Sequence, residues 1–372
     1  MQTASVEMTS ALLSELRIEE YRDFESLEGL RDEWNDLARR SNLTPAEEFE
    51  WLKTLWEFHH ANRTLIVLVA RDEAGITGIA PLVIGTERRK GMRVQVLRML
   101  GSFHALHGTP FLLGRRPDKT LNAFLDHLTK HHGNWALWFT GCVSGSPQEA
   151  MLFAAFDRSG YQFVTDKTET SPYLELRGTY EEKVKTLQPR FRTSLRSRER
   201  RLKEKGKAEL RFMDSVGLWE EGLAAIREIE KDSWKIGAGT AITVQDFQWQ
   251  FYLRYTPVAA SAGTLRIPVL YLDDEPLAYD YALLHRGVYY LMKTSYKNKW
   301  HDFYPGFVLR NWLMAWTYSQ QASEIDFLGK DEDWKMKWTE TTRPHAIHAV
   351  FNRNFGGSYL RACHRAVSWV RK

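Results

Sequence analysis

Hydrophobic and polar positions in the first half of the chain follow the periods of helices and strands in turn. Apolar residues three or four apart indicate helices that bury one face, and aromatic or β-branched runs indicate strands. The expected elements, in chain order, are Leu16–Tyr21, Leu27–Arg40, Glu47–His59, Thr64–Arg71, Ile76–Thr86, Val94–Leu100, Asp118–Lys130, Trp135–Thr140, Pro147–Ser159 and the closing strands of Gln162–Leu176. Their order predicts an α/β lobe.

The second half repeats this order of elements. The expected bounds are Thr179–Leu187, Pro189–Gly206, Glu209–Met213, Trp219–Trp234, Val244–Tyr255, Thr264–Leu284, Tyr289–Tyr296, Pro305–Ser319, Glu324–Leu328 and Asp331–Trp338. The hairpin at 264–284 matches the one at 64–84 in length, with Thr-Leu opening both and acidic residues at both turns. Because few residues are identical, the repeat is one of architecture. It favours two lobes, residues 1–178 and 179–372, joined near Gly178.

Composition narrows the class of protein. Of 372 residues, 43% are hydrophobic and 26% charged, as in soluble globular proteins, and a net charge of +4 does not indicate DNA binding. Cys142 and Cys363 are the only cysteines, which argues against a disulfide framework or a zinc ribbon and fits a reducing compartment. Met1–Leu16 lacks the pattern of a signal peptide, and no run of about 18 apolar residues occurs. We therefore expect a cytoplasmic protein without a membrane span, monomeric or homodimeric.

The turn after the aromatic strand 289–296 gives the clearest signal of a site. Pro305 suits the first turn of a helix, because its missing N–H would have no partner there. Gly306 has no side chain, so another group can approach the backbone closely. A strand that ends at a helix N-terminus leaves amides and the positive end of the helix dipole exposed. This arrangement suits a phosphate group.

This order, with Lys293–Tyr296, Pro305-Gly306, Glu324–Gly329 and Trp334-Lys335, resembles the GNAT acyltransferases. It is similar in particular to their two-lobed branch, which is related to Fem-type aminoacyl transferases and to acetyltransferases of polysaccharide operons. The resemblance covers most of the chain and is strongest over Gln188–Trp338. It implies two tandem GNAT-like lobes, each a mixed, mostly antiparallel twisted sheet flanked by helices.

The resemblance also implies a donor. In that superfamily acyl-CoA lies between two splayed parallel strands, with its pyrophosphate on the following helix. Acyl-CoA, with acetyl-CoA as the expected form, would then contact Thr294, Ser295, Tyr304, Pro305, Gly306, Phe307, Val308 and Leu309. The usual superfamily loop has more glycines. In the first lobe the counterpart, residues 114–118, has two arginines and no glycine after its proline, so we expect that lobe to have lost donor binding and to shape the acceptor groove.

Three arginines, Arg192, Arg196 and Arg200, share one face of the helix expected at 189–206. Guanidinium groups in a row repel one another unless an anion lies along them. The pattern is compatible with a docking face for a nucleotide-sugar diphosphate, an acyl-carrier protein or tRNA, and equally with a solvated basic face. The segment also resembles a basic helix motif of the Fem-like relatives, which implies that Arg192 and Arg196 face the interlobe groove.

Charged residues in apolar surroundings are further candidates for substrate binding. The resemblance places Glu230, Trp234 and Lys235 beside the acyl acceptor, and an ordinary helix end is the alternative. Lys293, in its apolar strand, needs an anionic partner or a lowered pKa. Asp280 on the neighbouring strand is a candidate partner; alternatively, Lys293 binds a carboxylate or phosphate of the substrate.

Acyl transfer needs a proton acceptor for the attacking group and a proton donor for the leaving thiolate. Glu230 and Asp326 are the candidate bases, and the Tyr296 phenol is the candidate acid. Trp334, Lys335 and Trp338 are candidates for closing the mouth of the site, with Lys335 reaching a phosphate. The alternative is an ordinary amphipathic helix.

The remaining motifs favour direct transfer without a metal. The adjacent residues His131 and His132 cannot share a helix face, and no metal or Ser or Cys nucleophile motif occurs. The preferred hypothesis is an acyltransferase that moves an acyl group from acyl-CoA to an amine or hydroxyl of a small, sugar-like or amino-acid-like acceptor in the interlobe cleft. Alternatives are an aminoacyl-tRNA-dependent transferase, an acyl-carrier-protein-dependent N-acyl amino acid synthase, and a non-catalytic binding protein on the same fold.

Overall fold

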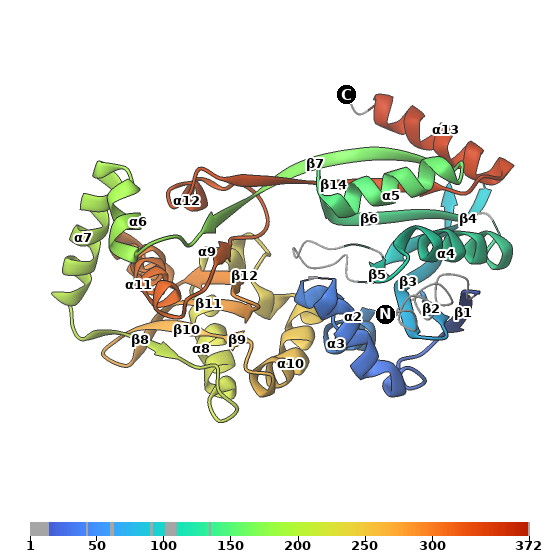
Figure 1. The fold of residues 1–372 in the computed structure, drawn as a ribbon. Coiled ribbons are helices and arrows are strands. Elements are labelled where there is room, and N and C mark those ends of the chain that lie inside the picture. Colours follow the sequence, from blue (N-terminus) through green and yellow to red (C-terminus); the bar gives the residue numbers. More distant parts are fainter. Residues whose placement is uncertain are drawn as a thin grey trace, which may run out of the picture. The chain divides into compact units, whose positions relative to one another are not determined.

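The computed structural model describes residues 15–41, 44–59, 63–89, 92–100, 109, 111–133 and 135–370. Contacts divide the chain into two units (Figure 1). Unit 1 contains the residues up to Glu169 and those from Pro344 onward, and unit 2 contains Thr170–Arg343. Residues 1–14, which make up most of the segment without a signal-peptide pattern, lie outside the described residues.

A mixed sheet with helices packed against it forms unit 1. Strands β1, β2, β3, β4, β6 and β14 are neighbours in that order, and among these pairs only β4 with β6 is parallel. Apolar side chains of the sheet and of α4 and α5 make the core. The elements are β1 (Arg17–Tyr21), η1 (Glu28–Leu30), α2 (Arg31–Arg40), η2 (Pro45–Glu47), α3 (Phe49–His59), β2 (Thr64–Asp72), β3 (Gly75–Arg89), β4 (Met92–Met99), β5 (Leu112–Leu113), α4 (Pro117–His131), β6 (Trp135–Val143), α5 (Pro147–Arg158), β14 (Thr342–Phe351) and α13 (Phe355–Val370).

In unit 2 the sheet is also mixed, with its strands in the order β8, β10, β11, β12, β13. Strands β12 and β13 are parallel, and the other pairs are antiparallel. Apolar clusters pack α7 and α11 against this sheet. The elements are α6 (Tyr180–Thr186), α7 (Pro189–Lys203), β8 (Ala208–Phe212), α8 (Trp219–Lys231), α9 (Trp234–Gly237), η3 (Ile242–Val244), α10 (Asp246–Ser261), β9 (Leu265–Arg266), β10 (Pro268–Leu272), β11 (Glu275–His285), β12 (Val288–Tyr296), η4 (Asn298–Phe303), α11 (Pro305–Ser319), β13 (Glu324–Asp326) and α12 (Asp333–Met336).

The two units share one order of elements, which confirms the predicted fold class. In each unit a strand, helices, a hairpin and a further strand lead through one helix to a parallel strand: β4, α4 and β6 in unit 1, and β12, α11 and β13 in unit 2. Among the described residues, no helix combines the length and the apolar character needed to cross a bilayer.

The last strand of each sheet comes from the other half of the sequence. Strand β14 pairs with β6 of unit 1, for example Phe351 with Ala136. The end of β7 (Gln162–Glu175) pairs with β13 of unit 2, for example Leu174 with Ile325. The sequence analysis assigned residues 344–372 to the second lobe and predicted neither β14 nor α13. The pairing with β6 groups these residues with unit 1 instead.

Candidate active site

The sheet of unit 2 opens at one strand. On one side β12 pairs with β11 along its whole length, with a register shift at Met292 where Tyr281 faces Lys293 and Ala282 faces Leu291. On the other side β12 pairs with β13 only over Val288–Tyr290. The rest of β12 therefore has a strand on one side alone within the described part of the chain. The bulge bends the strand where this opening begins.

Backbone groups of β12 point into the opening. The Lys297 N–H donates to the Leu277 carbonyl, on the β11 side, over 2.9 Å. Because successive residues of a strand direct their N–H groups to opposite sides, the amides of Thr294 and Tyr296 point away from β11. These two N–H groups are donors available to a molecule that enters the opening.

Helix α11 begins beside this opening with an unusual backbone conformation. Tyr304 is left-handed, with φ 51° and ψ 54°, which costs a residue with a Cβ about 1–2 kcal/mol. The N–H groups of Phe307 and Val308 return to the Tyr304 carbonyl, over 2.9 and 3.3 Å. The Gly306 N–H lies in the first turn and has no intrahelical acceptor. The chain thus presents a helix N-terminus, with its positive dipole end, to the open edge of β12.

Unit 1 has the same conformation at the equivalent helix start. Arg116, before Pro117 and α4, has φ 58° and ψ 48°. There Arg115 and Arg116 lie 2.9 and 3.6 Å from the carboxylate of Asp72. The repeated architecture therefore extends to a left-handed residue followed by proline. Loss of donor binding in this lobe stays a prediction.

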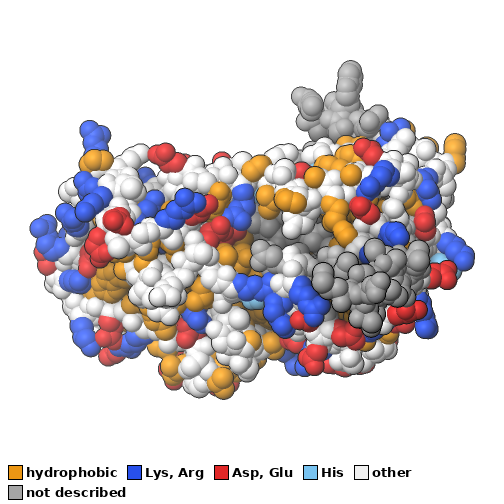
Figure 2. Space-filling model, viewed as in Figure 1, with side chains coloured by type: hydrophobic (Ala, Val, Ile, Leu, Met, Phe, Trp, Pro, Cys, Tyr) orange, Lys and Arg blue, Asp and Glu red, His pale blue; other side chains and the backbone are white. Residues whose placement is uncertain are grey.

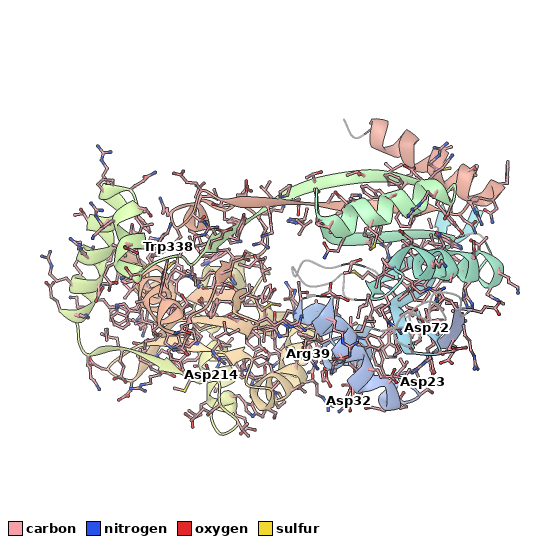
Figure 3. The ribbon with its side chains drawn as sticks, in the orientation of Figure 1. Asp23, Asp32, Arg39, Asp72, Asp214 and Trp338 are labelled. Atoms are coloured by element: carbon pink, nitrogen blue, oxygen red, sulfur yellow. The ribbon has the colours of Figure 1, made fainter. Side chains whose placement is uncertain are left out.

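A pocket of about 330 Å³ lies between the end of β12 and the start of α11. Trp234 and Tyr304 are 51% and 38% exposed, whereas Trp338 is 1% exposed. The aromatic lining of the pocket therefore extends from the surface to the interior. Trp338, which is labelled in Figure 3, packs edge-on against Phe191 of α7, with ring centroids 5.1 Å apart. The lining residues are Trp234, Thr294, Ser295, Tyr296, His301, Tyr304, Gly306, Phe307, Arg310, Trp334 and Trp338.

Most of this lining comes from positions named in the sequence analysis, but His301 and Arg310 were missed. Pro305, Val308 and Leu309 are buried, and the last two side chains belong to the apolar core under α11. At these positions the side chains are buried, so only backbone groups could contact an acyl donor.

Arg198, also missed, lies beside the helix start. Its guanidinium is 3.9 Å from the ring centroid of Tyr304 and 4.7 Å from that of Phe307. Its Nη1 is buried without a hydrogen-bond acceptor among the described residues, and burial lowers the pKa of Arg198. The signal was present in the sequence, because Arg198 follows Phe191 by seven residues and Leu195 by three on the buried stripe of α7. A cation and a helix N-terminus at one place favour an anion between them.

Arg192 and Arg196 lie away from this pocket. They line a separate hollow of about 610 Å³ with residues of α6 and with Asn311 of α11. Arg192 donates to the Lys185 carbonyl over 3.1 Å, and Arg196 is exposed. Lys and Arg side chains gather over this end of unit 2 (Figure 2). A docking face and a solvated basic face both stay compatible with this arrangement.

Asp280 pairs with Arg310, not with Lys293 as the sequence suggested. The pair is bidentate, with Nη2 to Oδ1 at 2.7 Å, and both side chains are buried. Asp280 faces Thr294 across the strands, and Lys293 faces Tyr281, so their side chains lie on opposite faces of the sheet. Burial raises the pKa of Asp280 although Arg310 opposes the shift.

Lys293 and Glu230 lie on the α8 and α10 side of the sheet. Lys293 donates to Gln248 of α10 over 2.9 Å; burial and the nearby charge of Lys235 lower its pKa to about 8, against the pull of Glu230. Burial also lowers the pKa of Lys235. Glu230 is fully buried and accepts hydrogen bonds from Thr243 (N–H at 3.0 Å, Oγ1 at 2.9 Å) and from the Tyr279 phenol at 2.7 Å. These three charged residues do not line the pocket.

Asp326, the other candidate base, and Lys335 are both held by hydrogen bonds at the turn after β13. Asp326 is 1% exposed, accepts from the Leu328 N–H over 2.9 Å and lies 3.8 Å from Arg343. Burial raises the pKa of Asp326 to about 6. Lys335 donates to the carbonyls of Leu328 and Lys330 over 2.7 and 2.9 Å. Lys335 therefore holds the turn that leads to Trp334, and its contact with a phosphate stays a prediction.

Known proteins share this domain and fold. Residues 189–336 match the family model of an acetyltransferase (GNAT) domain. The solved structure of FemX aligns with a TM-score of 0.61 at 12% identity, covering 88% of this chain and 96% of that one. A tandem GNAT protein from the clavulanic acid biosynthesis pathway aligns with a TM-score of 0.51 at 12% identity, covering 91% and 99%.

A conserved protein of unknown function from Bacteroides thetaiotaomicron aligns with a TM-score of 0.54 at 12% identity, covering 87% of this chain and 97% of that one. A comparison with curated proteins finds no match. At these identities the structural likeness shows the fold. Together with the matching domain it confirms the predicted resemblance to two-lobed GNAT and Fem-like proteins.

Proposed function

Starting from the GNAT acyltransferase domain that residues 189–336 form, we propose that this protein transfers an acyl group from acyl-CoA, with acetyl-CoA as the expected donor, to an amine or hydroxyl of a small acceptor. The observation that carries this proposal is that the N-terminus of α11 and the Arg198 guanidinium lie together beside the opening of the sheet. A diphosphate at this site would leave the thioester arm to enter the aromatic pocket. A volume of about 330 Å³ suits such an arm better than a whole nucleotide.

Residues around the opening suit the transfer chemistry. A bond forms between the acceptor nitrogen or oxygen and the acyl carbon, and the carbon–sulfur bond breaks. The amides of Thr294 and Tyr296 would stabilise the oxyanion of the tetrahedral intermediate. Burial raises the pKa of Tyr296 above its usual value, so the phenol carries a proton that the leaving thiolate can accept.

We propose that Asp326 or Glu230 is the base that accepts the proton released by the attacking group of the acceptor. Asp326, with its pKa of about 6, is ionised at neutral pH and still basic enough to accept a proton. Glu230 is held by three hydrogen bonds and lies near Lys235 and Lys293. Two lysines beside one carboxylate leave an excess of positive charge. This excess favours an acceptor that carries a carboxylate or phosphate.

Calorimetric titration with coenzyme A tests the donor site. Arg198→Gln should weaken binding about 10- to 100-fold, the loss expected for a hydrogen bond to a charged group. Gly306→Trp should abolish binding, because a Cβ there would lie 3.6 Å from the Tyr296 ring and a larger side chain would fill the pocket. Gly306→Ala and Arg192→Gln are the matched controls and should bind like the wild type. Wild-type protein that binds no coenzyme A, or variants that bind it equally, would refute the proposal.

A second donor class is favoured by the surface of α7. Arg196 and Arg200 are exposed along this helix, and Arg192 is partly exposed beside them. Such a face suits an acidic carrier protein or tRNA as the bearer of the acyl group. The thioester arm of a carrier protein would use the same pocket, so this candidate changes the donor and leaves the transfer step unaltered.

A further inference from the structure

Glu20 of β1 and two histidines at the end of α4 form a compact cluster in unit 1. Oε2 of Glu20 lies 2.8 Å from Nε2 of His127 and 3.0 Å from Nε2 of His132. One ligand atom from each residue lies within 4.8 Å of the others. The side chains are 16%, 18% and 7% exposed in that order, so the cluster is mostly shielded and one side remains open to water.

The end of α4 explains why the side chains of His131 and His132 point to different places. The sequence argument against a metal assumed that His131 and His132 both lie within a helix. Helix α4 ends at His131, and His132 has φ −118° and ψ 9°, outside the helical range. His132 therefore turns toward the oxygen that His127 also contacts. His131 packs against His127 with the two rings tilted by 38° and their centroids 4.5 Å apart, and it is exposed.

The donor set is one that a divalent transition metal uses. Two neutral imidazole nitrogens and a carboxylate oxygen are typical ligands of zinc, and three protein ligands leave a fourth position for water. Oε1 of Glu20 pairs with Arg22, so Oε2, which faces the two histidines, is left for a metal. A ligating carboxylate is often oriented in this way by an outer partner. A metal would replace the protons that the histidines now share with Glu20.

We propose that Glu20, His127 and His132 bind a divalent transition metal of the zinc class. Strand β1 stands at the end of the strand order, and among the described residues β2 is its strand partner. Glu20 and His127 are 107 residues apart, so a metal would close a long loop and fasten the edge strand to α4. This site lies in unit 1 and is independent of the donor site proposed in unit 2.

Titration of the metal-free protein, residues 1–372, with Co²⁺ tests the site. We expect visible absorption bands of a four-coordinate Co²⁺ centre that saturate at one equivalent, and a rise in Tm when Zn²⁺ is added. Glu20→Gln and His132→Asn should each lose the bands and the rise in Tm. Circular dichroism and the Tm without metal show that each variant is folded, so loss of binding is separable from loss of structure.

His131→Gln is the matched control, because His127 and His131, four apart on one helix, form a pair that can bind metal by itself. The proposed site keeps its bands in His131→Gln and loses them in Glu20→Gln. An adventitious pair would give the reverse, and that result overturns the proposal. Wild-type protein without Co²⁺ bands or a Zn²⁺-dependent Tm overturns it as well.

Discussion

Asp280 and Arg310 form an ion pair in which both side chains are buried, 0% and 2% exposed. Removing two charges from water is costly, and the bidentate geometry offsets that cost only while both partners are present. Arg310 also lies 5.7 Å over the Trp334 ring and lines the pocket. The pair therefore links the stability of unit 2 to the shape of the pocket wall.

Replacing one partner of this pair should destabilise the protein strongly. Arg310→Met leaves the Asp280 carboxylate buried and unpaired, and we expect a loss of about 3–5 kcal/mol in the free energy of unfolding. Arg310→Met with Asp280→Leu should lose much less than the sum of the single variants. Urea denaturation measures all three. Arg200→Met breaks an exposed pair with Glu204 and is the control, with an expected loss below about 1 kcal/mol. Additive losses in the buried pair would contradict this account.

Lys293 should make acceptor binding depend on pH. Its pKa of about 8 means that the ammonium is charged below this pH and loses its proton above it. If it binds an anionic group of the acceptor, the KM for the acceptor should rise about tenfold per pH unit above pH 8. Lys293→Arg keeps the charge and should remove the rise. Steady-state kinetics from pH 6.5 to 9.5 decide this, and a constant wild-type KM would exclude the role.

Unusual residues were easier to predict than their partners. Asp280 and Lys293 stand out as charged residues in apolar strands, and both are indeed buried or nearly so. Which face each occupies depends on strand register, and a shift of one residue reverses it. The bulge at Met292 has no clear signature in the sequence. The pairing of Asp280 with Arg310 therefore became visible only in the structure.

Among the elements, α7 and α11 contribute most residues of the proposed donor site. Their starts, Pro189 and Pro305, were predicted because proline at the first turn is a strong local signal. The apolar residues on the buried stripe of α7 are Phe191, Leu195 and Leu202. Arg198 completes that stripe, but a charged residue on an apolar face is not assigned to it by hydrophobic pattern. The helix was thus predictable from its hydrophobic pattern, whereas Arg198 could be found only by extending its buried stripe to a charged residue.

The outer face of α7 should distinguish the donor classes. Arg192→Gln with Arg196→Gln removes two positive charges that line a separate hollow and not the pocket. With a carrier protein or tRNA as donor, we expect a higher KM and a weaker dependence on salt concentration, because fewer counterions are released. With acyl-CoA as donor, kinetics should be unchanged. Initial rates at 50 and 200 mM salt, with each donor supplied separately, provide the comparison. Equal effects on both donors would show that the two arginines act on folding and not on docking.

For the whole molecule, the exchange of last strands decides which parts of the chain can fold alone. Unit 2 is continuous in sequence from Thr170 to Arg343 and contains the end of β7 that its sheet needs. Unit 1 is discontinuous, because β14 arrives from the C-terminal part of the chain. The architecture of two lobes was predictable from the repeated order of elements. The exchange was not, since a strand pattern does not say which sheet the strand joins.

Fragments should reflect this difference. We expect residues 170–343 to unfold cooperatively on heating, and residues 1–169 to aggregate or unfold without cooperativity, because the edge of β6 that β14 covers is left open. Joining residues 344–372 to the 1–169 fragment through a flexible Gly/Ser linker should restore a cooperative transition. Circular dichroism melts of the three fragments measure this. A cooperative melt of 1–169 alone would show that β14 is dispensable.

The same exchange delays completion of the first sheet during translation, because β14 is synthesised long after β6. About 200 residues separate the end of β6 from the start of β14. At roughly 5–20 residues per second, translation of that interval lasts about 10–40 s. Throughout this delay the nascent first sheet has an incomplete edge, along which a strand of another chain could pair.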